Sequence, residues 1–151
     1  MLCNGTAKLA DFGYAVHTVD NHGHVILSTN CCGTLEYKAP ETILATVPYN
    51  PLISDCYSLG VLLYVMVTHQ FPFGSGEEIR TPIGLTTLHN DIINKKWQMD
   101  DTIQKDHQLC SLLSQLLNPD LKERITVRQA FVHPWVPAAG VVDEAVDSMN
   151  H

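Results

Sequence analysis

The stretch that decides the fold is Ser54-Asp55-Cys56-Tyr57-Ser58-Leu59-Gly60-Val61-Leu62-Leu63-Tyr64-Val65-Met66-Val67. Apolar residues cover every face of the helix that this stretch predicts, whereas a surface helix carries one apolar stripe. Ser54 is expected to cap its N-terminus, and Asp55 lies at the positive end of the helix dipole. We therefore expect a central helix that other elements enclose on all sides.

Amphipathic helices joined by polar segments are predicted beyond Pro72. One covers residues 88–97, with Leu88, Ile92 and Ile93 on one side. A second covers residues 107–117 and directs five leucines toward the core. These leucines are Leu109, Leu112, Leu113, Leu116 and Leu117.

A last helix is expected to begin at Thr126. Thr126-Val127-Arg128-Gln129 fits a capping box, and Ile125 can pack over Ala130. Residues 138–151 carry three acidic residues and no Lys or Arg, so we expect an acidic, flexible and solvated tail there.

The N-terminal third has a different character. Ala7-Lys8-Leu9-Ala10 predicts a short strand, and residues 11–32 predict a long exposed loop with Val25-Ile26-Leu27 as its apolar run. Long loops in small domains usually serve function. The fold class expected is mainly α, with a short N-terminal β remnant.

Composition limits the classes of function. The chain has 151 residues, of which 45% are hydrophobic, and this suffices for one core. A net charge of −7 argues against binding to nucleic acid or to an anionic membrane. The longest apolar stretch, residues 59–67, is shorter than the ~20 residues that span a bilayer, so no transmembrane segment is predicted.

The cysteines indicate a reducing compartment. Their number is five, an odd number, and their spacing repeats no known metal motif. The N-terminus reaches polar residues too soon for a signal peptide. We expect an intracellular protein, cytoplasmic or nuclear.

Asp11-Phe12-Gly13 follows the predicted strand. A carboxylate at a strand end can bind a hard divalent cation, an aromatic ring can pack the segment down, and a glycine lets the backbone turn. The same tripeptide also suits an ordinary turn after a strand. Its meaning depends on the segments that follow it.

Gly33-Thr34-Leu35-Glu36-Tyr37-Lys38-Ala39-Pro40-Glu41 supplies that support, since Glu41 lies 30 positions after Asp11. The order Asp-Phe-Gly, loop, Ala-Pro-Glu resembles the activation segment of eukaryotic protein kinases. The pair Gly33-Thr34 with Tyr37 resembles the Ser/Thr type, and residues 49–67 resemble the testis-specific and calcium/calmodulin-dependent groups. Four later segments resemble the same family, although Tyr57 stands where the family commonly has Trp. They are Asp55-Cys56-Tyr57-Ser58-Leu59-Gly60, Phe71-Pro72-Phe73, Asn118-Pro119-Asp120-Leu121-Lys122-Glu123-Arg124-Ile125-Thr126 and His133-Pro134-Trp135.

The resemblance implies roles for individual residues. Asp11 would bind the Mg²⁺ that bridges the ATP phosphates. Thr34 would hydrogen-bond around the catalytic aspartate, and Asp55 would bind backbone of the catalytic loop. Glu41 would pair with Arg124, a structural contact. Phe12, Gly13, Tyr37 and Pro40 belong to the same activation segment, and the candidate phosphorylation sites in it are Thr18, Ser28 and Thr29.

Several parts of a kinase are missing from these 151 residues. The sequence contains no Gly-rich phosphate loop, no Val-Ala-Ile-Lys strand and no His-Arg-Asp catalytic loop, so no catalytic residue is assigned. The catalytic-loop arginine that usually receives an activation-loop phosphate is missing with them. Residues 1–137 therefore resemble part of a kinase domain, the large C-terminal lobe, and the chain would be a truncated product or a partial gene model.

Three hypotheses follow. The first is a chain derived from a Ser/Thr kinase, which uses ATP and Mg²⁺ and acts on protein substrates, but which is inactive alone. The second is a pseudokinase-like interaction module whose protein partner covers an exposed core face. The third is a metal-binding regulator that uses His22 and His24 with Cys31 or Cys32, although we interpret that segment as a mobile loop because no four-ligand spacing is present.

Overall fold

The computed structural model describes residues 2–3, 6–44, 47–98 and 100–136, and the expected acidic tail at 138–151 lies outside them. The described part is mainly helical, and the protein kinase resemblance predicted this fold class. It runs in the order β1, β2, α1 to α6, with short 3₁₀ helices at Phe12–Tyr14 (η1), Leu35–Tyr37 (η2) and Glu78–Arg80 (η3).

The β remnant is a small hairpin. Strands β1 (Leu2–Cys3) and β2 (Thr6–Ala7) pair antiparallel, with Leu2 opposite Ala7. The predicted strand at residues 7–10 was therefore wrong in extent, because β2 ends at Ala7 and residues 8–10 lie outside any strand. A strand this short is held by pairing with its neighbour more than by its own sequence.

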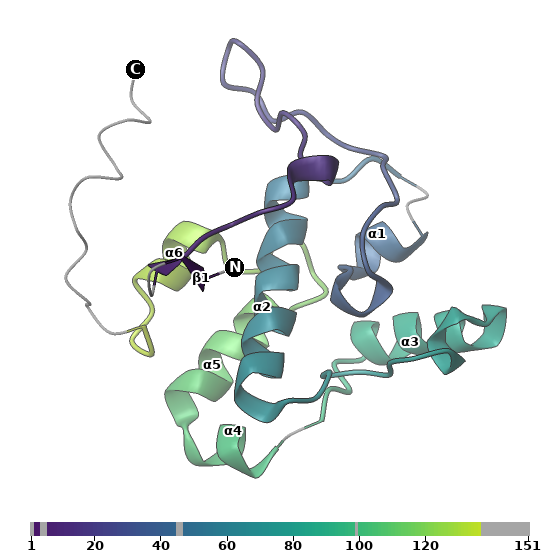
Figure 1. Ribbon diagram of the computed structural model, residues 1–151, viewed down its shortest axis with the longest axis vertical. Coiled ribbons are helices and arrows are strands. Elements are labelled where there is room, and N and C mark those ends of the chain that lie inside the picture. Colours follow the sequence, from purple (N-terminus) through teal and green to yellow (C-terminus); the bar gives the residue numbers. More distant parts are fainter. Residues whose placement is uncertain (1, 4–5, 45–46, 99, 137–151) are drawn as a thin grey trace.

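Helix α2 (Pro51–Thr68) runs through the centre of the molecule (Figure 1). It begins three residues before the predicted Ser54, because the side chain of Asn50 accepts a hydrogen bond from the Leu52 N–H and Pro51 occupies the first helical position. His69, in the left-handed conformation, ends it. At 18 residues it is long and apolar enough to cross a membrane by length and composition alone, but it contacts η2, α4 and α5 as the core helix of this fold.

The prediction that α2 is enclosed on all sides was wrong. Tyr57, Val61 and Tyr64 are almost completely buried. Leu59, Leu62 and Met66, which follow one another at helical spacing, are 39%, 45% and 67% exposed. One stripe of the central helix is therefore open in this chain.

Helices α1 (Pro40–Leu44) and α3 (Pro82–Ile93) pack together on one side of the molecule, on the right in Figure 1. The helix predicted at 88–97 instead starts at Pro82, behind the cap Thr81, and stops at Ile93. Leu88 and Ile92 are buried as expected, but Ile93 is 46% exposed. Helix α1 was not predicted.

Trp97 lies outside any helix. Its ring meets the Tyr64 ring edge to face, with 6.1 Å between centroids. The Tyr64 hydroxyl donates to the carbonyl of Gln98 at 2.8 Å. These contacts hold the segment after α3 against the central helix.

Helices α4 (Asp101–Lys105), α5 (His107–Leu116) and α6 (Val127–Phe131) complete the fold. The prediction of α5 is confirmed, and all five of its predicted inward leucines are buried. The capping box at Thr126 and Gln129 is confirmed as well, and Ile125 and Ala130 share one buried cluster. Helix α4, a single short turn capped by Asp100, was not predicted.

Gly60 sets how closely α2 approaches α5. A Cβ atom at Gly60 would lie 2.7 Å from the Leu116 Cβ and 3.1 Å from the Leu117 Cδ2. We predict that Gly60→Ala lowers the free energy of unfolding by about 1–2 kcal/mol, because overpacking outweighs the helix propensity gained. Urea denaturation measures the effect, with Gln108→Ala on the exposed face of α5 as the control. An unchanged or higher stability of Gly60→Ala would contradict this account of the helix crossing.

Candidate functional site

A buried ion pair connects two segments that lie far apart in the kinase-like sequence. Glu41, on α1, and Arg124, in the segment before α6, lie 83 positions apart in the chain. The Arg124 Nη1 donates to the Glu41 Oε1 at 2.7 Å, and its Nη2 donates to Oε2 at 3.0 Å. The Arg124 side chain is 0% exposed and that of Glu41 is 9% exposed. This is the contact that the resemblance implied for the two residues, in bidentate geometry.

Neighbouring groups complete the hydrogen bonding of this pair. The Ser54 hydroxyl donates to the Glu41 Oε1 at 2.7 Å. Arg124 also donates from Nε to the Asn118 carbonyl and from Nη1 to the Ile53 carbonyl, at 2.7 and 3.2 Å. The charges are thus paired and hydrogen-bonded, which a buried ion pair needs if it is to offset desolvation.

Tyr57 packs directly against this network. The guanidinium carbon of Arg124 lies 5.1 Å from the centre of the Tyr57 ring, a cation–π contact. Burial raises the pKa of the Tyr57 hydroxyl far above its usual range. That hydroxyl is the buried side-chain polar atom without a hydrogen-bond partner in the described residues. Tyr57 therefore acts here as an aromatic packing residue.

The activation segment follows the surface before it reaches α1. Backbone hydrogen bonds of 2.9 Å join Ser28 to Tyr49 in both directions, and the Tyr49 hydroxyl donates to the Asn30 carbonyl at 2.6 Å. Among the candidate phosphorylation sites, Thr18 and Ser28 are half-buried and Thr29 is exposed. The loop is thus pinned at its base near Tyr49.

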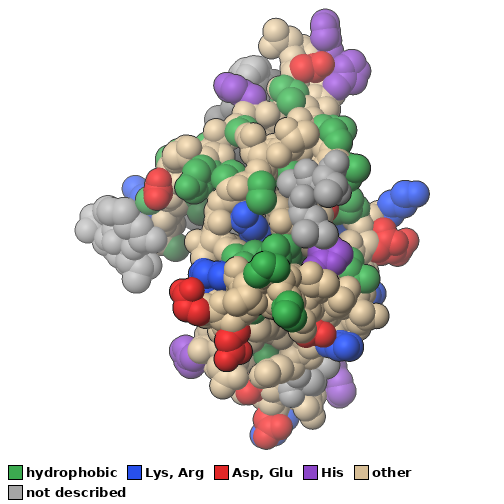
Figure 2. All heavy atoms as spheres, turned by 90° about the vertical axis from the view of Figure 1, so that its right-hand side faces the viewer, with side chains coloured by type: hydrophobic (Ala, Val, Ile, Leu, Met, Phe, Trp, Pro, Cys, Tyr) green, Lys and Arg blue, Asp and Glu red, His purple; other side chains and the backbone are tan. Residues whose placement is uncertain are grey.

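The tip of the loop projects from the body. Figure 2 shows histidine side chains and an acidic side chain there, and the Asp20 carboxylate accepts hydrogen bonds from the backbone of His24 and His22. These bonds, above all that from His24, lower the pKa of Asp20. The described residues bring together no group of three His, Cys, Asp or Glu side chains that could hold a metal ion, so they give the metal-regulator hypothesis no support.

Asp11-Phe12-Gly13 lies on the surface. Asp11 adopts a left-handed backbone, with φ of 62° and ψ of 73°, and Phe12–Tyr14 form η1. Phe12 is 69% exposed, so the expectation that its ring packs the segment down was wrong. A non-glycine residue in the left-handed region costs energy, and such residues cluster at functional sites.

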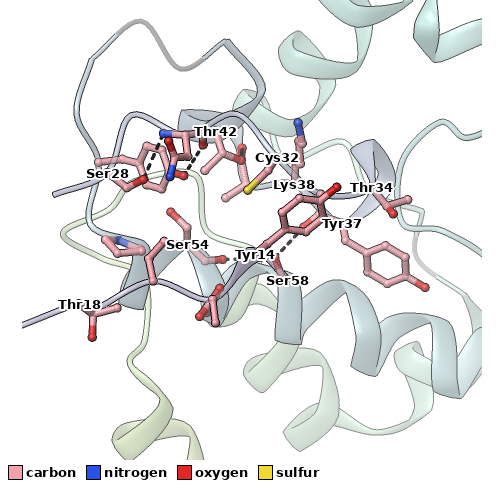
Figure 3. A pocket seen from close by; sticks show the side chains of 18 residues that line it. Tyr14, Thr18, Ser28, Cys32, Thr34, Tyr37, Lys38, Thr42, Ser54 and Ser58 are labelled. Carbon is pink, nitrogen blue, oxygen red and sulfur yellow. Dashed lines mark hydrogen bonds between the residues drawn. The ribbon is translucent and has the colours of Figure 1, made fainter. Parts of the chain in front are cut away.

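A cavity of about 360 Å³ lies between the activation segment and the first turns of α2. Figure 3 shows Thr34, Tyr37 and Cys32 reaching it from the activation segment, with Ser54 and Ser58 on the side of α2. The Ser58 hydroxyl donates to the Tyr37 carbonyl at 2.8 Å and so fixes one wall. Asp55 also lines the cavity.

Two carboxylates expected at the site have different surroundings. The protein around Asp55 displaces water from one side of its carboxyl group and raises the pKa of that group, although much of the side chain is open to solvent. Asp11 does not line the cavity that Thr34 and Asp55 share. The structure thus brings Thr34, Tyr37 and Asp55 together around one cavity. Glu41 and Arg124 pair with each other next to it. Asp11 lies outside this group.

Sequence reasoning missed part of this site. Ser54, which the sequence predicts as a helix cap, instead donates a hydrogen bond to the Glu41 carboxylate. The sequence predicts no role for Ser58, which donates to the Tyr37 carbonyl. Lys38 Nζ lies 3.4 Å from the Cys31 Sγ, a contact between residues seven positions apart. The one available signal for the serines was their spacing of four residues, which places both on the same face of α2.

The ion pair makes a specific prediction. Arg124→Met leaves the Glu41 carboxylate buried without its partner, and we expect the free energy of unfolding to fall by about 3–5 kcal/mol. Glu41→Gln combined with Arg124→Met removes both charges and should recover part of this loss. Chemical denaturation measures all variants, with Lys96→Met at the exposed Lys96–Asp91 pair as the control, where at most about 1 kcal/mol is expected. Equal losses of stability in Arg124→Met and in the control would contradict the stabilising role of the buried Glu41–Arg124 pair.

Comparison with known proteins finds protein kinases among the relatives of this chain. The family model for the protein kinase domain matches residues 1–136. Testis-specific serine/threonine-protein kinase 2 of Mus musculus is 31% identical over 130 residues, which cover 85% of this chain and 34% of the relative. Aurora kinase C of Mus musculus is 32% identical over 133 residues, which cover 88% of this chain and 42% of the relative.

The chain therefore spans less than half the length of these relatives. The family match nevertheless covers all of the residues that the structure describes and includes Asp11, Glu41 and Arg124. The protein belongs to the protein kinase family and is of the serine/threonine type.

Proposed function

We propose that this chain supplies the activation segment and late helices of an enzyme that transfers the γ-phosphate of ATP to Ser or Thr hydroxyls of proteins. The observation that supports this most is the 360 Å³ cavity that Thr34 and Asp55 both line. The family resemblance assigns each of these residues to contacts with the catalytic loop. The 151 residues contain no such loop, and the cavity is a space in which one could sit.

The residues present do not by themselves form a site for ATP and Mg²⁺. Mg²⁺ in such enzymes is held by one or two carboxylates together with substrate phosphates. Asp11 is exposed, and no cluster of three acidic, His or Cys side chains exists in the part of the chain that the structure describes. Asp11 could contribute one ligand, and its left-handed backbone supports a functional role for it. Phosphoryl transfer therefore needs groups from outside these residues.

The compartment we propose is the cytoplasm or the nucleus. Cys31, Cys32, Cys56 and Cys110 form no disulfide among the residues that the structure describes. Free cysteines are typical of reducing compartments, where protein substrates with Ser and Thr hydroxyls are also available. On the face shown in Figure 2, Lys and Arg side chains lie scattered among Asp and Glu, which favours protein partners over nucleic acid.

The first test is an activity assay of the chain alone. Incubated with Mg²⁺ and ATP and a generic Ser/Thr substrate, the purified protein is expected to transfer no more phosphate than its Asp11→Ala variant. The reason is that one cation ligand cannot supply both positioning and charge stabilisation. Transfer above the Asp11→Ala level would contradict inactivity of the isolated chain.

A second test restores what the chain lacks. The part of a testis-specific serine/threonine kinase that precedes its Asp-Phe-Gly motif would be fused to residue 8 of this chain. The fusion is expected to phosphorylate a Ser/Thr substrate, its Asp11→Asn variant to lose at least about a hundredfold in rate, and its Asp101→Asn variant, changed on the surface of α4, to keep full activity. Equal activity of the fusion and its Asp11→Asn variant would contradict the proposal that Asp11 and its activation segment take part in phosphoryl transfer.

One observation favours a second candidate, a pseudokinase-like module that binds a protein partner. Leu59, Leu62 and Met66 leave an apolar stripe of the central helix exposed, and large exposed apolar patches commonly mark interfaces. Analytical ultracentrifugation of the purified chain separates the candidates. A stable monomer with no tendency to associate would argue against a binding module.

A further inference from the structure

A second ion pair ties the activation segment to a distant part of the chain. Glu36 lies in η2, and Arg80 lies at the end of η3, 44 positions later. The Arg80 Nη2 donates to both carboxylate oxygens of Glu36, at 3.0 Å to Oε1 and 3.3 Å to Oε2. The Glu36 side chain is 7% exposed, whereas that of Arg80 is 42% exposed. The carboxylate is therefore surrounded by protein, unlike that of an ordinary surface pair.

Gly76 completes the contacts of this pair. Its N–H donates to the Glu36 Oε1 at 3.4 Å, and its carbonyl accepts a hydrogen bond from the Arg80 Nη1. Gly76 has a φ of 81°, a conformation in which a side chain would be strained. Partial burial opposes ionisation of Glu36, but hydrogen bonds from its own backbone, from Gly76 and from Arg80 hold its pKa below the usual range. Each of the three residues thus contacts the other two.

The arginine projects from a firmly packed support. Its neighbour Ile79 is 5% exposed and belongs to the buried cluster that contains Tyr57 and Val61 of the central helix. A Cβ atom at Gly84, in α3, would overlap the carbonyl oxygen of Glu78, so α3 packs directly on η3. The core and α3 therefore both fix the place of η3.

The glutamate lies on a turn that forms part of the cavity wall. Thr34, which precedes η2, and Tyr37, which ends it, both line the cavity of about 360 Å³. Two backbone hydrogen bonds of 3.1 Å close this turn, from Tyr37 to Thr34 and from Lys38 to Leu35. A displacement of η2 therefore moves two of the residues that line the cavity.

Local bonds alone do not fix η2. It is a single 3₁₀ turn, and turns this short depend on tertiary contacts. The Thr34 side chain makes no capping hydrogen bond to it. The ring of Tyr37 meets the Phe71 ring edge to face, with 5.4 Å between centroids, and this contact holds the end of the turn. The middle of the turn is held through Glu36.

We propose that Arg80 is a positioning residue: through Glu36 it holds η2 in place, so that Thr34 and Tyr37 keep their positions at the cavity. This inference rests on the proposed function in one respect, because the cavity is the space in which a catalytic loop could sit. In an enzyme completed by that loop, a displaced Thr34 would orient it poorly. Arg80 would thus affect the rate of phosphate transfer without contact to ATP or to the protein substrate.

The first test measures amide hydrogen exchange in the full chain and does not involve phosphate transfer. We expect the Tyr37 and Lys38 amides to exchange several times faster in Arg80→Gln than in the wild type, while the Leu113 amide in α5 keeps its rate. Arg128→Gln, the matched control, removes the same charge from an exposed position on α6 and should match the wild type at all three amides.

Two results of this experiment would overturn the proposal. One is an unchanged exchange rate of the Tyr37 and Lys38 amides in Arg80→Gln. The other is an equal acceleration at Leu113, which would mean that the variant has lost stability throughout the chain.

Glu36→Gln provides a second variant of the same contact. It should accelerate the Tyr37 and Lys38 amides as Arg80→Gln does. The combination of Glu36→Gln with Arg80→Gln should add little to either change, because both remove one interaction. Additive effects of the two changes would show that Arg80 does not act through Glu36.

The second test uses the fusion described above, joined at residue 8. There Arg80→Gln is expected to lower kcat at least about tenfold with the KM for ATP unchanged, and Arg80→Lys, which keeps the charge, to recover part of the loss. An unchanged kcat of Arg80→Gln in an active fusion would overturn the positioning role. A fusion that is inactive with Arg80 in place would contradict the proposed function alone, and the amide exchange rates would then decide the role of Arg80.

Discussion

The rest of the structure depends on the buried pair of Glu41 and Arg124. It joins two segments 83 positions apart, and the side chain of Ser54 and the backbone of Ile53 connect it to the central helix. Because both charges are removed from water, neither residue can be lost alone without leaving an uncompensated charge in the core. The activation segment therefore has a fixed end on α1.

Successive turns of one helix serve two open surfaces. The first turns of α2 carry Ser54, Asp55 and Ser58 to the cavity beside the activation segment. The later turns carry Leu59 to Met66 into an apolar groove beside α6. The two surfaces differ in chemistry, since the cavity lining includes hydroxyl and carboxylate groups beside its apolar residues, whereas the groove lining is apolar throughout.

Most of the late helices could be predicted from the sequence, because their signals are local. The leucine spacing of α5 and the capping box of α6 depend on residues three or four positions apart, and both predictions are confirmed. Helix α2 begins at Pro51, earlier than predicted, because its starting signals, the cap Asn50 and Pro51, precede the hydrophobic run on which the prediction rested. The short helices α1 and α4 have too few residues for a periodic pattern, and tertiary contacts hold them.

The sequence by itself determined the family and the fold class, because ordered motifs and helical spacing are properties of the chain alone. The partnership of Glu41 with Arg124 was implied by the resemblance to that family, and the structure confirms the contact. Only the tertiary structure decided which face of the central helix stays open and which residues share the cavity. When a helix is apolar on every face, its sequence does not indicate which face the rest of the chain will cover. That choice is made by packing between segments far apart in the sequence, and it left Leu62 and Met66 exposed while Tyr57 and Tyr64 were buried.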